Sequence, residues 1–342
     1  GLAKPTGRQR RGGGRRLWRA GGFRARNAPR MNFALAHLSD PHLPIPAGAL
    51  RPLTQFTGKR LLAYLAWLRK RRGNVVRPEA LLADLDAHAA DHVAVTGDLT
   101  NLALPGEFAA ARDWLARLGP PERATVVPGN HDATAPVPWE QGAGHWRPWM
   151  ADDGAAAAGP RFPFLRRRGP VALIGLNSAV PTPPGSAAGR LGGGQLALLP
   201  ALLDAAGREG LFRVVLVHHP PFRGAGRPWR ALRDRAALRE ALARSGAELV
   251  LHGHEHAALR AVVEGPAGPI PVLGAPHARR AVGEAAGWLL HRIGRDGEGG
   301  WRLDTAARVW DTEAGVFRTG RRWTVRISSG AARRCESPLE AA

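Results

Sequence analysis

The 342-residue chain is poor in several residue types, and each scarcity excludes a class of protein. Its single cysteine, Cys335, excludes an internal disulfide framework and a thiolate metal cluster. It also fits a reducing compartment, so we expect a cytoplasmic protein. No window approaches the roughly eighteen consecutive apolar residues of a membrane-spanning helix. Apolar residues nevertheless make up 44% of the chain, which is enough for a sizeable buried core.

Acidic residues are absent from residues 1–30, which carry +10 of the formal net charge of +21. This segment holds Lys4, nine arginines and two glycine clusters without periodicity, so we expect a disordered basic arm. No apolar stretch follows its twin arginines, and we expect no export signal. Two interpretations stand: an arm that contacts nucleic acid or anionic lipid, or a segment outside the native protein, which would start at Met31. The charge alone predicts no specific nucleic-acid binding.

Short apolar runs alternate with helix-like segments from Met31 onward. The runs lack alternating polar residues, as is typical of strands covered on both faces. Strands alternating with helices predict an α/β domain over residues 31–327, with a tail over 328–342 and loops at 155–160 and 181–194. The predicted strands are 33–38, 93–96, 125–127, 171–176, 214–217, 249–251 and 272–273, then hairpin strands at 288–293, 301–309 and 317–327. The predicted helices are 78–90, 107–118, 196–206 (with an interior proline, Pro200) and 231–244.

Candidate metal ligands follow five of the predicted strands, at the point where each strand ends. Ligands gather outside the carboxyl ends of strands in open α/β sheets, so we expect these segments to meet. Each segment alone has an ordinary explanation as a turn, a helix cap or a core histidine. Five such coincidences favour one shared metal site. The segments are Asp40-Pro41-His42, Gly97-Asp98, Gly129-Asn130-His131-Asp132, His218-His219-Pro220 and His252-Gly253-His254-Glu255-His256.

This ordered set of motifs, which runs from Leu35 to His256, resembles the signature of the calcineurin-like metallophosphoesterases, and no position of the pattern is missing. The resemblance implies a four-layer α/β/β/α sandwich that holds two metal ions, with the Asp98 carboxylate bridging them. By resemblance, the first ion would be held by Asp40, His42, Asp98 and His256, and the second by Asp98, Asn130, His218 and His254.

Other residues of the motifs would support the metals rather than bind them. The resemblance implies that His131 protonates the leaving alkoxide, while Asp132 orients the His131 ring and raises its pKa. His219 and His252 have weaker claims to a supporting role. Glycines at positions 97, 129 and 253 are expected where the backbone turns sharply or passes close to the metals.

The donor types suit hydrolysis of a phosphoester. Imidazoles and carboxylates favour Mn²⁺, Fe²⁺/Fe³⁺ or Zn²⁺, and the absence of thiolates argues against structural zinc. Two aspartates neutralise two divalent ions only in part, which leaves positive charge for a phosphate oxygen. A water that bridges both ions becomes hydroxide near neutral pH and can attack phosphorus in line with the leaving oxygen.

Differences between these motifs and those of related phosphoesterase families narrow the range of expected substrates, by analogy alone. Leu99-Thr100-Asn101 follows Asp98 in place of the Asp-Arg-Gly of the protein Ser/Thr phosphatases, and the only tyrosine, Tyr64, is not at the Asn101 position where purple acid phosphatases have a tyrosine ligand. His131 replaces the arginine of the lipid A pyrophosphatases. The chain is most similar to the bacterial class III cyclic-nucleotide and glycerophosphodiester phosphodiesterases, which implies a small phosphodiester substrate such as a cyclic nucleotide.

Two alternatives stand beside a phosphodiesterase. One is a phosphatase or pyrophosphatase acting on nucleotide or lipid-linked phosphate. The other is a metal-free scaffold or nucleic-acid-binding protein that acts through residues 1–30.

A helical insertion at about 47–75 also has two interpretations. The apolar stripe and flanking cations of residues 59–72 are typical of a helix on a membrane surface or over a lipid phosphodiester, or of an ordinary surface helix packed on the core.

Overall fold

The computed structural model of the chain describes residues 31–70, 75–154, 161–222, 227–279, 285–327 and 332–333. The predicted basic arm (1–30), the predicted loop at 155–160 and most of the predicted tail (328–342) lie outside these residues. Among the described helices, none has the length and apolar character needed to cross a bilayer.

The first sheet has seven strands in the order β13-β12-β11-β10-β1-β2-β3. Its parallel strands end in register, with Leu38 opposite Val95 and Val95 opposite Val126, so the loops that follow them start at the same edge. The antiparallel strands β10 to β12 confirm the predicted hairpins. The strands are β1 (Met31–Leu38), β2 (His92–Val95), β3 (Ala124–Val126), β10 (Gly287–Arg295), β11 (Trp301–Asp311), β12 (Val316–Ile327) and β13 (Ala332–Arg333).

The second sheet has six strands in the order β4-β5-β6-β7-β9-β8. The four central strands are parallel and were predicted, whereas the antiparallel edge strands β4 and β8 were not. β4 contains three consecutive arginines and therefore lacks an apolar pattern; one of them, Arg166, is buried and donates to the Ala124 carbonyl at 2.9 Å. The strands are β4 (Phe164–Arg168), β5 (Val171–Gly175), β6 (Phe212–Leu216), β7 (Leu249–His252), β8 (Arg260–Val263) and β9 (Ile270–Gly274).

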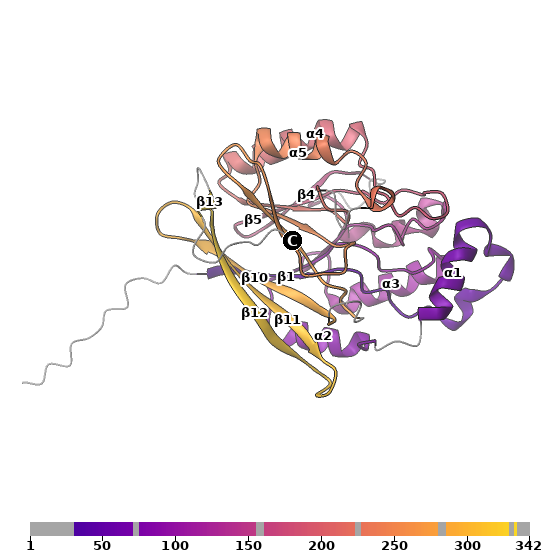
Figure 1. Cartoon of the computed structure of the whole chain (residues 1–342). Coiled ribbons are helices and arrows are strands. Elements are labelled where there is room, and N and C mark those ends of the chain that lie inside the picture. Colours follow the sequence, from indigo (N-terminus) through magenta and orange to yellow (C-terminus); the bar gives the residue numbers. More distant parts are fainter. Residues whose placement is uncertain are drawn as a thin grey trace, which may run out of the picture.

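Helices cover the outer face of each sheet, which completes the predicted four-layer α/β/β/α sandwich (Figure 1). Side chains alternate along β5: Ala172 and Ile174 pack in the cluster beneath α4 and α5, whereas Val171 and Leu173 pack in the core that includes the first sheet. Helix α4 continues through Pro200. The helices are α2 (Pro78–Ala87), α3 (Pro105–Leu118), α4 (Gly193–Arg208) and α5 (Arg235–Ser245).

A helical segment between β1 and α2 packs beside the predicted site. It contains the 3₁₀ turns η1 (Ala47–Leu50) and η2 (Leu53–Gln55) and helix α1 (Gly58–Lys70), which lies beside α3 in Figure 1. One face of α1 packs Tyr64 and Trp67 into a small cluster with Phe56, Leu102 and Leu104. The predicted insertion is therefore attached to the loop that follows β2. Leu61, Leu62 and Leu65 of α1 are exposed and do not belong to this cluster.

Two buried imidazoles away from the predicted site bear on stability. His92 Nε2 lies 2.8 Å from Thr125 Oγ1, and His291 Nδ1 lies 2.9 Å from Thr305 Oγ1. Burial lowers the pKa of each histidine to about 3, because a low-dielectric interior disfavours the imidazolium ion.

We predict that the free energy of unfolding falls as the pH is lowered from about 6.5 towards 3, since only the unfolded chain binds protons at these histidines in that range. Each histidine lowers the free energy of unfolding by at most about 1.4 kcal/mol for each pH unit in this range. Above the pKa of histidine in the unfolded chain, the free energy of unfolding no longer depends on these two groups. Urea unfolding of His92→Gln, compared at neutral and mildly acidic pH, should show a smaller acid loss than the parent chain. His145→Gln, at a half-buried position, should match the parent. An undiminished acid loss in His92→Gln would contradict this assignment.

Candidate metal centre

The five predicted ligand segments follow β1, β2, β3, β6 and β7 and meet at the carboxyl ends of both sheets. Main-chain hydrogen bonds extend the strand pairing into these loops: Asp40 N–H donates to the Gly97 carbonyl at 3.0 Å, and Gly253 N–H donates to the His218 carbonyl at 3.1 Å. The topology thus brings together residues that are up to about two hundred positions apart.

The backbone of this region is left-handed at residues that carry side chains. Such conformations are unfavourable for non-glycine residues and gather at functional sites when the surrounding structure enforces them. Among the described residues, seven non-glycine positions have positive φ, and five of these are predicted ligands: Asp40, His42, Asp98, His254 and His256.

Two of the predicted glycines allow the loops to approach each other. A Cβ atom at Gly129 would collide with the Asp98 carboxylate, and one at Gly253 would collide with the Ser39 hydroxyl. Gly97 has a φ of +94°, which only glycine adopts readily. The expectation of close backbone approach is confirmed at these positions.

The first predicted ligand set forms a compact group whose donor atoms lie within 4.8 Å of one another. His256 Nε2 is 3.1 Å from Asp40 Oδ1, and His42 Nε2 is 3.7 Å from Asp98 Oδ2. His42 Nδ1 donates to the Thr100 carbonyl at 3.0 Å, which leaves the Nε2 lone pair directed at the group. The members are Asp40, His42, Asp98 and His256.

The two carboxylates of this group oppose each other electrostatically. Burial, together with the neighbouring Asp40, raises the pKa of Asp98 well above its usual value. Burial also acts to raise the pKa of Asp40, but nearby histidines, His256 first, lower it overall. A cation between the two carboxylates would remove this conflict, because it favours the ionised form of both.

The second predicted set brings acceptor atoms face to face. His218 Nδ1 donates to the Thr96 carbonyl at 2.6 Å, so the Nε2 atom presents a lone pair. That atom lies 3.1 Å from Asn130 Oδ1, itself an acceptor, and 3.5 Å from Asp98 Oδ2. His254 Nδ1 donates to the same Asn130 oxygen at 2.7 Å, which leaves His254 Nε2 buried with a lone pair and without a hydrogen-bond partner. These converging acceptors fit a metal ion.

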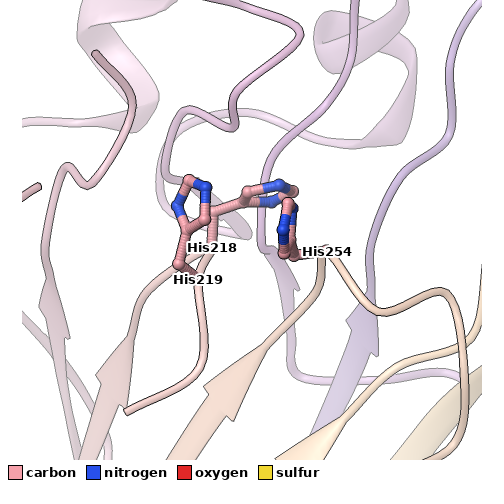
Figure 2. Close-up of side chains that lie close together, drawn as sticks. All are labelled: His218, His219 and His254. Atoms are coloured by element: carbon pink, nitrogen blue, oxygen red, sulfur yellow. The ribbon is translucent and has the colours of Figure 1, made fainter. Parts of the chain in front are cut away.

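A different trio, His218, His219 and His254, also brings ring nitrogens within 4.8 Å (Figure 2). Both nitrogens of His219 are already engaged, however: Nε2 donates to the Ala187 carbonyl at 3.0 Å, and Nδ1 accepts from Ser178 Oγ at 2.8 Å. A neutral ring in this tautomer has no free lone pair. We therefore infer that His219 supports His254, whose ring centroid is 4.4 Å away, and does not bind a metal.

His252 ends β7, and its supporting role stays a prediction. Its Nδ1 lies 2.9 Å from the Gly253 carbonyl, and its ring packs edge-on against Phe222. Burial lowers the pKa of His252 to about 4, so the ring is neutral at physiological pH.

The expected pairing of Asp132 with the His131 ring is wrong. His131 Nδ1 instead donates to the Asn101 carbonyl at 2.8 Å. Both Asp132 oxygens accept from the loop after β2 and from Gly129: Asp98 N–H at 2.9 Å, Gly129 N–H and Thr100 N–H at 2.8 Å, and Thr100 Oγ1 at 2.9 Å. Burial lowers the pKa of His131 to about 4; the Asn101 carbonyl and the charge of Asp40 act to raise it, but Asp132 is not among the groups that shift it. Asp132 therefore joins the loops that hold Asp98 and Asn130.

Sequence reasoning gave no role to two residues that complete this region. Glu107 is buried in the first turn of α3 and accepts from the Asn101, Leu102 and Leu104 N–H groups at 2.7 to 3.1 Å, which fixes the carbonyl that holds His131. A glutamate three residues after a helix start is a capping signal that could have found it. Arg230 donates to the His254 carbonyl at 2.8 Å and lies in a 3₁₀ turn without any motif.

The chain belongs to the calcineurin-like phosphoesterase family, whose family model matches residues 33–258. The family consists of metal-dependent phosphoester hydrolases that typically use two divalent ions, and the clustered donors described above supply residues able to bind them.

One solved structure with a TM-score above 0.5 shares the fold at low sequence identity, and two further matches have lower scores. A dimetal phosphatase from Danio rerio superposes with a TM-score of 0.51 at 13% identity, covering 87% of this chain and 99% of that one. The sulfate thiohydrolase SoxB from Thermus thermophilus gives 0.43 at 18% identity, covering 84% of this chain and 58% of that one. The calcineurin-like phosphoesterase YfkN from Bacillus subtilis gives 0.34 at 10% identity, covering 87% and 90%. No curated protein sequence matches the chain.

We predict that Asp132→Ala lowers the free energy of unfolding of the metal-free protein by roughly 3–5 kcal/mol, because several buried N–H groups lose their acceptor. The loss should be the same in a His131→Ala background, since the His131 ring makes no contact with the carboxylate. Urea unfolding of the four proteins of this cycle, in the presence of chelator, measures both values. An interaction energy between the two substitutions well above about 0.5 kcal/mol would contradict this and show that Asp132 orients the His131 ring.

Proposed function

We propose that this protein is a dinuclear metal-dependent phosphodiesterase that hydrolyses a small phosphodiester such as a cyclic nucleotide. The observation that carries the proposal is the position of Asp98 Oδ2 between the two ligand sets: it lies 3.7 Å from His42 Nε2 and 3.5 Å from His218 Nε2. A carboxylate oxygen approached by lone-pair-bearing nitrogens of both sets is suited to bridge two cations.

Two ions bound there, Mn²⁺, Fe²⁺/Fe³⁺ or Zn²⁺ by their donor types, would supply Lewis-acid stabilisation and an activated water. The chain contributes the geometry around them. With two divalent ions bound, Asp40 and Asp98 would place two negative charges against four positive ones, so the centre would attract an anionic phosphoester. Hydrogen bonds from the His42 and His218 Nδ1 atoms to main-chain carbonyls fix the tautomer that directs each Nε2 lone pair inward.

His131 is placed to give a proton to the leaving alkoxide. Its ring packs edge-on against His42 with centroids 4.6 Å apart, and the side chain remains half-buried, so a substrate can reach it. Because Nδ1 donates to the Asn101 carbonyl, Nε2 is the atom that exchanges a proton. Burial lowers the pKa of the free ring, and the negative charge of a bound phosphoester acts in the opposite direction.

The charge of the motif that follows Asp98 favours a phosphodiester substrate over a phosphomonoester, which carries more negative charge. The motif after Asp98 is Leu99-Thr100-Asn101 and carries no arginine for the extra charge of a phosphomonoester. Arg230 lies half-buried beside the second ligand set, outside that motif, and one of its N–H groups donates to the His254 carbonyl. A lipid-linked phosphoester is the second candidate substrate, and the exposed leucines of α1 beside the centre support it.

We predict that the Mn²⁺-loaded protein hydrolyses bis(4-nitrophenyl) phosphate with a kcat/KM at least about tenfold above that for 4-nitrophenyl phosphate. Cyclic AMP, glycerophosphodiesters and UDP-diacylglucosamine in the same assay separate the candidate substrates.

Asp98→Ala should lose both metal and turnover, whereas Asp204→Ala, at an exposed position of α4, should keep both. Preference for the monoester would contradict the diesterase, and absence of hydrolysis by the metal-loaded protein would contradict the enzyme.

We predict that His131→Ala retains its metal content but loses roughly 10²–10⁴-fold in kcat on an alkyl phosphodiester, because general acid catalysis is worth that much for a poor leaving group. The loss should be far smaller with a nitrophenyl diester, whose leaving group departs without a proton. Metal analysis and steady-state kinetics on both substrates measure the difference. Full activity on the alkyl diester would remove His131 from the role of proton donor.

A further inference from the structure

Helix α1 leaves a face of leucines in solvent. The side chains of Leu61, Leu62 and Leu65 are 40%, 52% and 46% exposed. Positions i, i+1 and i+4 share one side of a helix, and Arg69 continues the same side one turn later. Tyr64 and Trp67 occupy the opposite side and pack on the body of the protein. The leucine face, defined by Leu61, Leu62 and Leu65, is therefore not needed to hold α1 in place.

The charge around the leucine face has one sign. Residues 43–77 contain no aspartate or glutamate, and the basic residues of this stretch with described side chains are Arg51, Lys59, Arg60, Arg69 and Arg77. Exposed leucines combined with basic residues and no acidic ones are typical of helices that lie in the interface of an anionic bilayer. A second copy of this chain would bring equal positive charge against the face and be repelled.

Contacts of α1 hold the leucine face close to the metal centre. Arg60 donates to the carbonyls of Leu102 and Ala103 at 3.0 and 2.9 Å, in the loop that begins with the Asn101 carbonyl bound to His131. Lys59 Nζ donates to Thr182 Oγ1 at 2.5 Å. The helix is thus fixed to the rim of the site rather than to a remote surface.

A tryptophan on the same rim extends the surface. Ala187 N–H and Ser186 Oγ donate to the Trp229 carbonyl at 2.8 and 3.2 Å, and Thr182 Oγ1 donates to the Ser186 carbonyl at 2.8 Å. The segment that binds Lys59 thereby connects α1 to Trp229, whose side chain is exposed. Tryptophan side chains favour the boundary between lipid and water.

We propose that the leucine face of α1 binds the surface of an anionic lipid bilayer and holds the metal centre at the level of the lipid headgroups. This inference does not depend on the proposed phosphodiesterase reaction, because it concerns binding alone.

The test is co-sedimentation of the full chain with vesicles of phosphatidylcholine and phosphatidylglycerol at physiological salt. The variant Leu61→Ser/Leu62→Ser/Leu65→Ser should bind these vesicles on the order of 10²-fold more weakly, since each half-exposed leucine contributes several-fold to partitioning. The matched control is Leu198→Ser/Val262→Ser/Val316→Ser, which alters three side chains of similar exposure, 54%, 41% and 48%, on other elements. It should bind like the parent, and any contribution of residues 1–30 is common to all three proteins.

Equal binding by the leucine variant and the parent would overturn the proposal, as would equal binding of the parent to vesicles of phosphatidylcholine alone. If the parent does not bind vesicles but forms a dimer that the leucine variant loses, the face joins two copies and the proposal is wrong. Unchanged hydrolysis of a soluble diester by the leucine variant shows that the fold is retained, so a failure of membrane binding is distinguishable from a failure of the reaction.

Discussion

The structure depends on a group of buried acceptors that the protein satisfies only in part: Asp98 Oδ1 accepts from His131 N–H at 2.7 Å and Asp40 Oδ2 from His254 N–H at 3.2 Å, while other acceptor atoms of the group face one another. Asp40 and Asp98 bring two carboxylates together, while His218 Nε2 faces Asn130 Oδ1 at 3.1 Å, acceptor against acceptor. Burying such groups is costly unless something positive lies between them. Bound cations would meet this requirement, and the left-handed backbone at five of the predicted ligands indicates that the fold keeps this arrangement although it strains the backbone.

Carboxylates around this group are satisfied differently, and the contrast separates supporting residues from ligands. Asp132 and Glu107 are also buried, but each accepts several N–H groups from the loops that present the ligands. His219 follows the same logic, since both of its ring nitrogens have protein partners although it lies against His254. Proximity alone would make His219 a ligand, whereas its hydrogen bonds support the prediction that it holds His254 in place.

Much of this architecture could be predicted from the sequence, because buried parallel strands are apolar runs and their polar ends line one edge. The predicted strands and the convergence of the five ligand segments follow from that pattern. Elements held by polar contacts could not be predicted from apolar runs. Strand β4 contains Arg166, whose buried guanidinium donates to a main-chain carbonyl, and Arg230 contacts the site from a turn that carries no motif. The ring-orienting contact that the family resemblance implied for Asp132 does not form, because the turn directs this carboxylate to backbone N–H groups.

The central claim is that two cations lie on either side of Asp98. Anomalous diffraction from crystals of the Mn²⁺-loaded protein tests it most directly. The account predicts two manganese peaks, one contacted by Asp40, His42, Asp98 and His256, and the other by Asp98, Asn130, His218 and His254. A single peak, or a peak bound by the His219 ring together with His218 and His254, would contradict it.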